Sequence, residues 1–190
     1  MSRKEEWLDL YDKNHLPLNV SIQRGEKIPK NACRLVVHIC IFNTKGEMLI
    51  QQRQSTKKSL PDKWDLSAGG QVKSGEHSAE GAQRELFEEL GIHADFSVLR
   101  PKVTMHFEEG FDDIYILTLD TDLDSLTLQP DEVKDAAWAG CETILDMIRT
   151  GNFVPYHESY IRLLFALQEL GNPFDHSELW TDSKPSADQH

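Results

Sequence analysis

Three glutamates have the spacing that would let them act together on one ligand. Glu85, Glu88 and Glu89 belong to the segment 70–92, which reads GQVKSGEHSAEGAQRELFEELGI. On a helix they would share one turn, where like charges repel by roughly a few tenths of a kcal/mol per pair. A hard divalent cation held by carboxylate oxygens removes this repulsion. The spacing therefore predicts a site for Mg²⁺, for which Mn²⁺ could substitute.

The same segment has the pattern of an amphipathic helix. At about 100° per residue, Glu89 falls about 40° to one side of Glu85 and Glu88 about 60° to the other. The apolar residues fall on the opposite side of the wheel: Ala79, Ala82, Leu86, Phe87 and Leu90. The pattern predicts an acidic face for a metal ion and an apolar face for the core.

The ends of this helix carry further signals. Gly91 stands where a left-handed cap would end the helix, and either Ser74 or Ser78 could cap its start. Arg84 precedes Glu88 by one helical turn and is placed to neutralise or orient it.

These residues also carry a resemblance to a known family. The segment fills every fixed position of the box G-x5-E-x7-R-E-U-x-E-E-x-G-U, in which U is a bulky aliphatic residue, and so resembles the Nudix hydrolases. The filled positions are Gly70, Glu76, Arg84, Glu85, Leu86, Glu88, Glu89, Gly91 and Ile92. The resemblance implies an α/β fold, an α/β/α sandwich with a mixed β-sheet. It also implies hydrolysis of a nucleoside diphosphate linked to another group, X.

The resemblance implies a role for each box residue. Glu85, Glu88, Glu89 and the carbonyl of Gly69 are the expected metal ligands. Gly70, Glu76 and Gly91 are expected to support the structure, with Glu76 contacting Arg84 and so holding the loop against the helix. The resemblance also implies that Arg84 is a catalytic residue.

The general base, which must take a proton from the attacking water, is left open between two glutamates. One candidate is Glu85, and the other is Glu132, which immediately precedes an expected strand. A solvated loop carboxylate is an equally acceptable interpretation of Glu132.

Outside the box, Arg53 and Trp64 are the expected substrate-binding residues. Arg53 ends a strand that would point toward the site, and Trp64 could stack on a base, although a core position is the alternative. The nearby Lys57, Lys58 and Lys63 are interpreted as surface charges. His38 is interpreted as a core histidine. Asp113 could face the metal, or belong to an exposed acidic turn with residues 108–112.

The chain also resembles one Nudix subgroup, the one near the isopentenyl-diphosphate isomerases. This narrower resemblance covers residues 31–149, and the residues that carry it run from Phe42-Asn43 to Trp138. An isomerase is therefore one alternative function. The catalytic Cys-Gly-His of that family corresponds to residues 68–70, Ala-Gly-Gly, and one of its metal-binding histidines corresponds to Arg34. A non-catalytic nucleotide-sensing module is the other alternative, but no basic DNA-binding helix accompanies it.

The composition of the chain restricts the kinds of molecule that it could bind. The 190 residues carry a formal net charge of −12, which argues against binding a nucleic-acid polymer. No apolar run is long enough for a membrane span, and three scattered cysteines form neither a disulfide framework nor a zinc motif. We expect a cytoplasmic enzyme that acts on a small diphosphate substrate. The resemblance further implies that the protein forms a homodimer.

The pattern along the chain predicts an extension over 1–30, a Nudix domain over 31–172 and a disordered tail over 173–190. The extension would contain an edge strand at 6–11. Further strands are predicted at 34–42, 47–53, 64–68, 95–107, 113–119 and 133–139. Two more helices are predicted at 141–149 and 155–170.

Overall fold

The computed structural model describes residues 5–170, so the tail predicted for 173–190 lies outside the described residues. The strands are β1 (Trp7–Tyr11), β2 (Pro17–Gln23), β3 (Cys33–Phe42), β4 (Met48–Arg53), β5 (Trp64–Asp65), β6 (Ala68–Gln71), β7 (Val103–Phe107), β8 (Gly110–Thr118) and β9 (Val133–Ala139). The helices are α1 (Ser78–Leu90), α2 (Cys141–Arg149) and α3 (Glu158–Glu169), with a 3₁₀ turn at Leu123–Ser125. No helix among these residues is long and apolar enough to cross a membrane.

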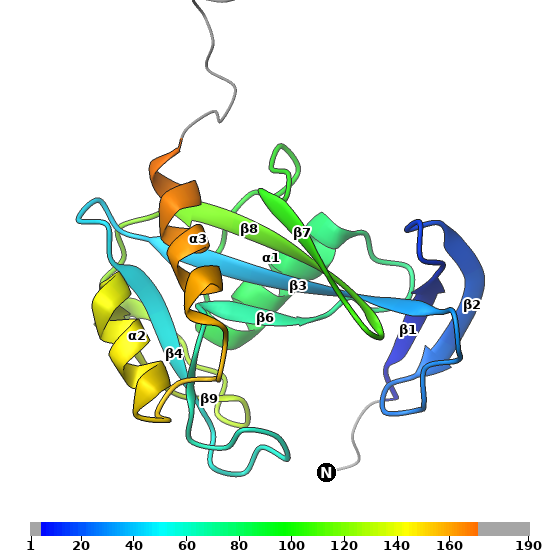
Figure 1. Ribbon diagram of the computed structural model, residues 1–190, viewed down its shortest axis with the longest axis horizontal. Coiled ribbons are helices and arrows are strands. Elements are labelled where there is room, and N and C mark those ends of the chain that lie inside the picture. The colour runs from blue at the N-terminus through cyan, green and yellow to red at the C-terminus, as the bar shows by residue number, and fades with distance from the viewer. Residues whose placement is uncertain (1–4, 171–190) are drawn as a thin grey trace, which may run out of the picture.

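Strand β3 is the centre of a mixed sheet (Figure 1). It pairs in parallel with β8 and antiparallel with β1, β4 and β6. The predicted hairpin of β3 and β4 forms, but only Phe42 and Met48 pair across it. Beyond that pair the strands separate, because β3 goes on to pair with β6, whereas β4 pairs with β5 and β9.

Ser67 stabilises the point where β3 and β4 separate. Its buried hydroxyl accepts a hydrogen bond from Ile41 N at 2.8 Å and donates one to the carbonyl oxygen of Leu49 at 2.5 Å. The single strand predicted for 64–68 is therefore wrong. Ser67 lies between two short strands, β5 and β6, which pair with different neighbours.

The side chains of β3 alternate between two apolar cores. Val37, Ile39 and Ile41 pack in the core beneath α1, whereas Cys40 and Phe42 pack in the core shared with α2 and α3. Helix α1 lies behind the sheet in Figure 1 and α3 in front of it. The predicted α/β/α sandwich with a mixed sheet is confirmed.

The strand predicted near the N-terminus forms, but it is not at an edge. β1 pairs with β3 on one side and with β2 on the other. β2 was not predicted, although Leu18, Val20 and Ile22 alternate with polar residues along it. Its residues are almost all exposed in the structure. The extension before residue 31 thus adds two strands to the same sheet.

The long strand predicted for 95–107 is also wrong. Only Val103–Phe107 is a strand. Pro101 lacks the N–H that a ladder needs, and Phe96 packs in the core from an irregular segment that precedes it. The acidic link predicted over 108–112 is a turn of two residues, 108–109, because β8 begins at Gly110.

Two helix starts differ from the prediction. Neither Ser74 nor Ser78 is the N-cap of α1. That residue is His77, whose N–H donates to the Glu80 carboxylate at 2.7 Å in a capping box. The third helix begins at Glu158 rather than 155, after the N-cap His157.

Candidate active site

Helix α1 separates an acidic face from a core face, as predicted. Glu85 and Glu89 are 8% and 7% exposed, although both are carboxylates, while Leu86 and Leu90 are fully buried in the apolar core. Phe87 departs from the prediction, because it is 48% exposed and lies against the tilted His93 ring instead of entering the core. Gly91 ends the helix at φ 70°, in the predicted left-handed cap.

Arg84 holds the acidic face together. Its guanidinium donates to both oxygens of Glu76 at 2.6 and 2.8 Å, to Glu85 at 2.8 Å and to Glu88 at 3.1 Å. It also donates to the carbonyl oxygen of Gln71 at 3.1 Å. The predicted contact between Glu76 and Arg84 is therefore present. These contacts fix the positions of the Glu76, Glu85 and Glu88 side chains relative to one another.

Glu89 is the most perturbed carboxylate of the site. It accepts hydrogen bonds from the N–H of Gly69 at 3.0 Å and from the side-chain amide of Gln51 at 2.9 Å. Burial, followed by the charge of Glu85, raises the pKa of Glu89 to about 7. Two buried carboxylates that repel each other in this way make a suitable set of oxygen donors for a divalent cation.

The ladder between β3 and β6 turns Gly69 toward these carboxylates. Val72 N donates to the carbonyl oxygen of Leu35, so the antiparallel alternation leaves Gly69 opposite His38 in a pair without ladder hydrogen bonds. The N–H and C=O of Gly69 consequently face away from β3. This orientation suits the predicted use of its carbonyl as a metal ligand.

The arrangement of Glu88 does not match the prediction of three converging ligands. Its carboxylate is bound by Arg84 and by Lys73, at 3.1 and 3.4 Å. Within residues 5–170, no three His, Cys, Asp or Glu side chains are arranged to hold a metal ion. The residues that fit Mg²⁺ chemically are the buried pair Glu85 and Glu89, with the Gly69 carbonyl beside them.

A cavity of about 160 Å³ opens next to this pair, where β3 and β4 separate. Gly69 and Gly70 form part of its wall, and Arg53, Asp65 and His38 line it as well. The cavity therefore joins the carboxylates of α1 to a group of polar side chains on the sheet.

His38 was predicted to be a core histidine and instead lines this cavity. Its Nδ1 lies 2.7 Å from Asp112 Oδ2 on the parallel strand β8. Burial opposes protonation, but Asp112 outweighs it and raises the pKa of His38 to about 9. Asp112 Oδ1 is buried without a hydrogen-bond partner. Only the pairing of β3 with β8 brings these residues together, so local sequence patterns do not reveal the site.

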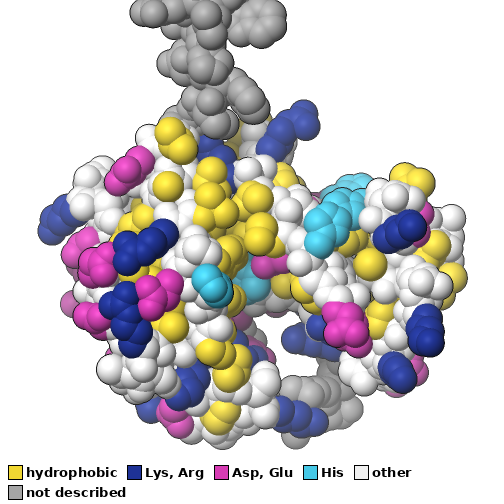
Figure 2. Space-filling view, in the orientation of Figure 1, with side chains coloured by type: hydrophobic (Ala, Val, Ile, Leu, Met, Phe, Trp, Pro, Cys, Tyr) yellow, Lys and Arg dark blue, Asp and Glu magenta, His cyan; other side chains and the backbone are white. Residues whose placement is uncertain are grey.

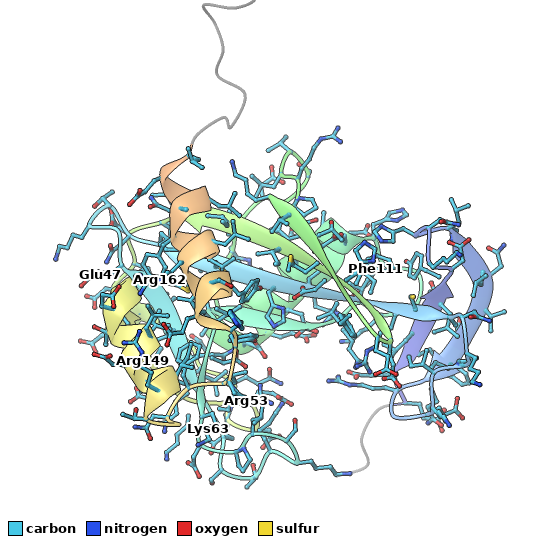
Figure 3. The ribbon with its side chains drawn as sticks, in the orientation of Figure 1. Glu47, Arg53, Lys63, Phe111, Arg149 and Arg162 are labelled. Carbon is cyan, nitrogen blue, oxygen red and sulfur yellow. The ribbon has the colours of Figure 1, made fainter. Side chains whose placement is uncertain are left out.

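Arg53 lies at the cavity, as predicted, at the end of β4. It contacts Asp65 at 3.0 Å and donates to the carbonyl oxygens of Ser59 and Leu60. Figure 3 shows Arg53 close to Lys63, whose carbonyl accepts from Arg53 N. Trp64 packs partly buried against the core of α2 and α3, which is the alternative raised from the sequence.

Glu132 and Lys57 form an ion pair beside the site. Burial, followed by the charge of Arg53, lowers the pKa of Lys57, and the charges of Glu89 and Glu85 oppose this lowering. The pair therefore lies within electrostatic reach of the box carboxylates. Lys57 was predicted to be a surface charge, yet it is partly buried here.

Asp113 neither faces the metal site nor belongs to an exposed acidic turn, the two locations predicted for it. It accepts hydrogen bonds from Ser78 and Thr104, both at 2.6 Å, and so ties α1 to β7 and β8.

Comparison with known proteins decides the family. A sequence model of the NUDIX domain matches residues 33–164. An uncharacterized Nudix hydrolase of Listeria monocytogenes is 45% identical over 164 residues, which are 86% of this chain and 95% of that protein. The chain belongs to the Nudix family. The predicted enzyme class, a Nudix pyrophosphohydrolase, is confirmed at that level.

Solved structures agree with the Nudix fold. A crystal structure of a Deinococcus radiodurans protein superposes with a TM-score of 0.68 at 25% identity, covering 88% of this chain and all of the other. A MutT protein of Methanosarcina mazei superposes with a TM-score of 0.57 at 26% identity, covering 72% and 94%. These matches do not support the narrower resemblance to isopentenyl-diphosphate isomerases.

Proposed function

We propose that this Nudix protein is a Mg²⁺-dependent enzyme that hydrolyses the diphosphate of a nucleoside diphosphate linked to a group X. The observation that carries the proposal is the buried pair Glu85 and Glu89, beside a cavity that also holds cationic side chains. A bound divalent cation would stabilise the charge that develops on the phosphate oxygens. Glu85, Glu89 and the Gly69 carbonyl would hold it, and Glu88 would join after leaving Arg84.

The chain's own residues supply the remaining steps. Water attacks one phosphorus atom, the bridging P–O bond breaks, and the leaving phosphate keeps the electron pair. We assign the proton of the attacking water to Glu132, which Lys57 holds beside the site. Arg84 keeps Glu85 in place, and Arg53 is positioned at the cavity to contact a phosphate oxygen. Glu85 is the rival general base.

The isomerase alternative lacks its proton-transfer group. Ala68-Gly69-Gly70 occupies the place of the isomerase Cys-Gly-His. None of the three cysteines replaces it, since Cys40 is fully buried with a raised pKa and neither Cys33 nor Cys141 lines the cavity. A sensing module without catalysis is the weaker alternative, because it gives no reason to retain two buried glutamates.

Cleavage of a panel of phosphoanhydrides, measured by chromatography of the monophosphate products, tests the proposal. The panel includes nucleotide sugars, dinucleoside polyphosphates, ADP-ribose, coenzyme A and nucleoside triphosphates, each with and without Mg²⁺. We expect at least one to be cleaved only with Mg²⁺, and Glu89→Gln to lose about 100-fold or more in kcat. The matched control is Glu142→Gln, which alters an exposed carboxylate on α2. Equal activity in Glu89→Gln, or no cleavage across the panel, would refute the proposal.

A further inference from the structure

The first two strands lie before the residues that match the family, yet they are hydrogen-bonded to the loop between β6 and α1. The family match begins at residue 33, whereas β1 and β2 end at Gln23. Asp9 of β1 accepts hydrogen bonds from the Ser74 hydroxyl at 2.6 Å and from Gly75 N at 2.8 Å. Ser74 N also donates to the carbonyl oxygen of Trp7 at 2.7 Å. The β1–β2 hairpin is thus held against the loop that precedes α1.

This attachment brings Arg24 to the cavity of the active site. Arg24 follows directly after β2 and forms part of the cavity wall, together with Gly70 and Gln71. Figure 2 shows the surface hollowed between the hairpin and the rest of the domain, with Lys and Arg side chains around the opening. A residue outside the matched domain therefore faces the same space as Gly69 and Gly70.

The ion pair of Arg24 leaves it available to a ligand. Arg24 contacts Glu6 at 2.5 Å, and Glu6 also lies 3.6 Å from Lys73. The Arg24 side chain is 47% exposed, and exposed ion pairs of this kind contribute little to stability. If Arg24 turned to a bound anion, Lys73 would still neutralise Glu6.

Two arginines from distant parts of the chain line the cavity of an acidic protein. The chain carries a net charge of −12, yet Arg24 and Arg53 both line this one space, which they share with one carboxylate, Asp65. Burial and then the charge of Arg53 lower the pKa of nearby Lys57, Glu89 opposes this lowering, and Arg24 adds to it. A phosphate group is the natural ligand for several cations around two glycines, because its oxygens accept charge-assisted hydrogen bonds.

We propose that Arg24 is a substrate-binding residue that contacts a phosphate oxygen of the diphosphate, and that the β1–β2 hairpin serves to place it there. This inference rests on the proposed function of the same site. It adds that substrate affinity depends on a segment outside the matched Nudix domain, held in place by the clamp between Asp9 and the 74–75 loop.

Binding of imidodiphosphate, which resists hydrolysis, tests the role of Arg24 without requiring activity. Isothermal titration in Mg²⁺ would compare the whole protein with Arg24→Gln, Arg24→Lys and Glu6→Gln. We expect Arg24→Gln to raise the Kd about tenfold or more, and Arg24→Lys to recover part of the loss. Glu6→Gln breaks the same ion pair but keeps the cation, so its Kd should stay unchanged or fall.

The control for charge alone is Arg162→Gln. Arg162 pairs with Glu142 at 2.8 Å and lies on the helical side of the molecule in Figure 3, so its loss should not change the Kd. A structural role for Arg24 predicts that Arg24→Gln and Glu6→Gln lower the melting temperature alike and leave binding intact. That result, or an equal loss of affinity in Arg24→Gln and Arg162→Gln, would overturn the inference.

The inference and the proposed function can fail separately. If the wild type cleaves a diphosphate and Arg24→Gln leaves its KM unchanged, the inference is wrong and the hydrolase stands. If nothing in the panel is cleaved but imidodiphosphate binds through Arg24, the hydrolase proposal is wrong and the inference stands.

Discussion

The carboxylate of Glu85 lies directly against the Cα of Gly70. A Cβ atom on Gly70 would stand 2.3 Å from Glu85 Oε1 and 2.8 Å from Glu85 Oε2. Glycine at this position of β6 therefore sets where a buried carboxylate of α1 can be, and with it the distance from that carboxylate to the cavity.

Gly70→Ala should displace Glu85 and impair catalysis more than folding. The added methyl group cannot coexist with the present carboxylate position, so we expect kcat to fall about tenfold or more. The matched control is Gly140→Ala, because Gly140 has a φ of −77° and open space around its Cα. Steady-state kinetics and melting temperatures would be measured for both. If the two variants behave alike, the contact with Glu85 has no catalytic importance.

Glu76→Gln should destabilise the protein measurably. Glu76 accepts two hydrogen bonds from Arg84, and the two side chains are 22% and 17% exposed. Removing one partner of a partly buried charged pair costs about 1–3 kcal/mol. The control is Glu158→Gln, which removes an equivalent two-bond contact with Arg149 on the surface and should leave stability nearly unchanged. Urea unfolding would contradict the prediction if both variants lost the same free energy.

The pair of His38 and Asp112 should make stability depend on pH. The folded protein raises the pKa of His38 from 6.5 to about 9, so the folded state holds its proton more tightly than the unfolded state does. The contribution is complete below about pH 6.5, decreases as the pH rises toward 9, and is lost above that value. Unfolding free energies of wild type and Asp112→Asn would be compared across this range. The difference should shrink with rising pH, and a constant difference would disprove a charged pair.

Glu132→Gln should lower kcat by about 100-fold while leaving KM nearly unchanged, because a general base acts mainly on the chemical step. Lys57→Gln should have a smaller effect in the same direction, since Lys57 acts on this step through its ion pair with Glu132. Lys58→Gln, on an exposed neighbour, is the control. A kcat for Glu132→Gln within about twofold of wild type would return the role of general base to Glu85.

The sequence by itself determined the local chemistry of α1. Its 3.6-residue period separated Glu85 and Glu89 from Leu86 and Leu90, and Gly91 marked where the helix ends. Such features depend on neighbours within a few residues, so they can be predicted without tertiary contacts. The same holds for the hairpin of β3 and β4, whose turn residues are explicit in the sequence.

Only the tertiary structure decided which distant residues share the site. His38 meets Asp112 through parallel pairing of strands 74 residues apart, and Arg24 reaches the cavity through a hairpin clamped by Asp9. Strand pairing and loop docking depend on the whole sheet and leave no periodic signal in any single segment. The sequence thus indicated the helix that carries the sequence box of a diphosphate hydrolase. The packing of the sheet decided which cationic side chains line the cavity beside that helix.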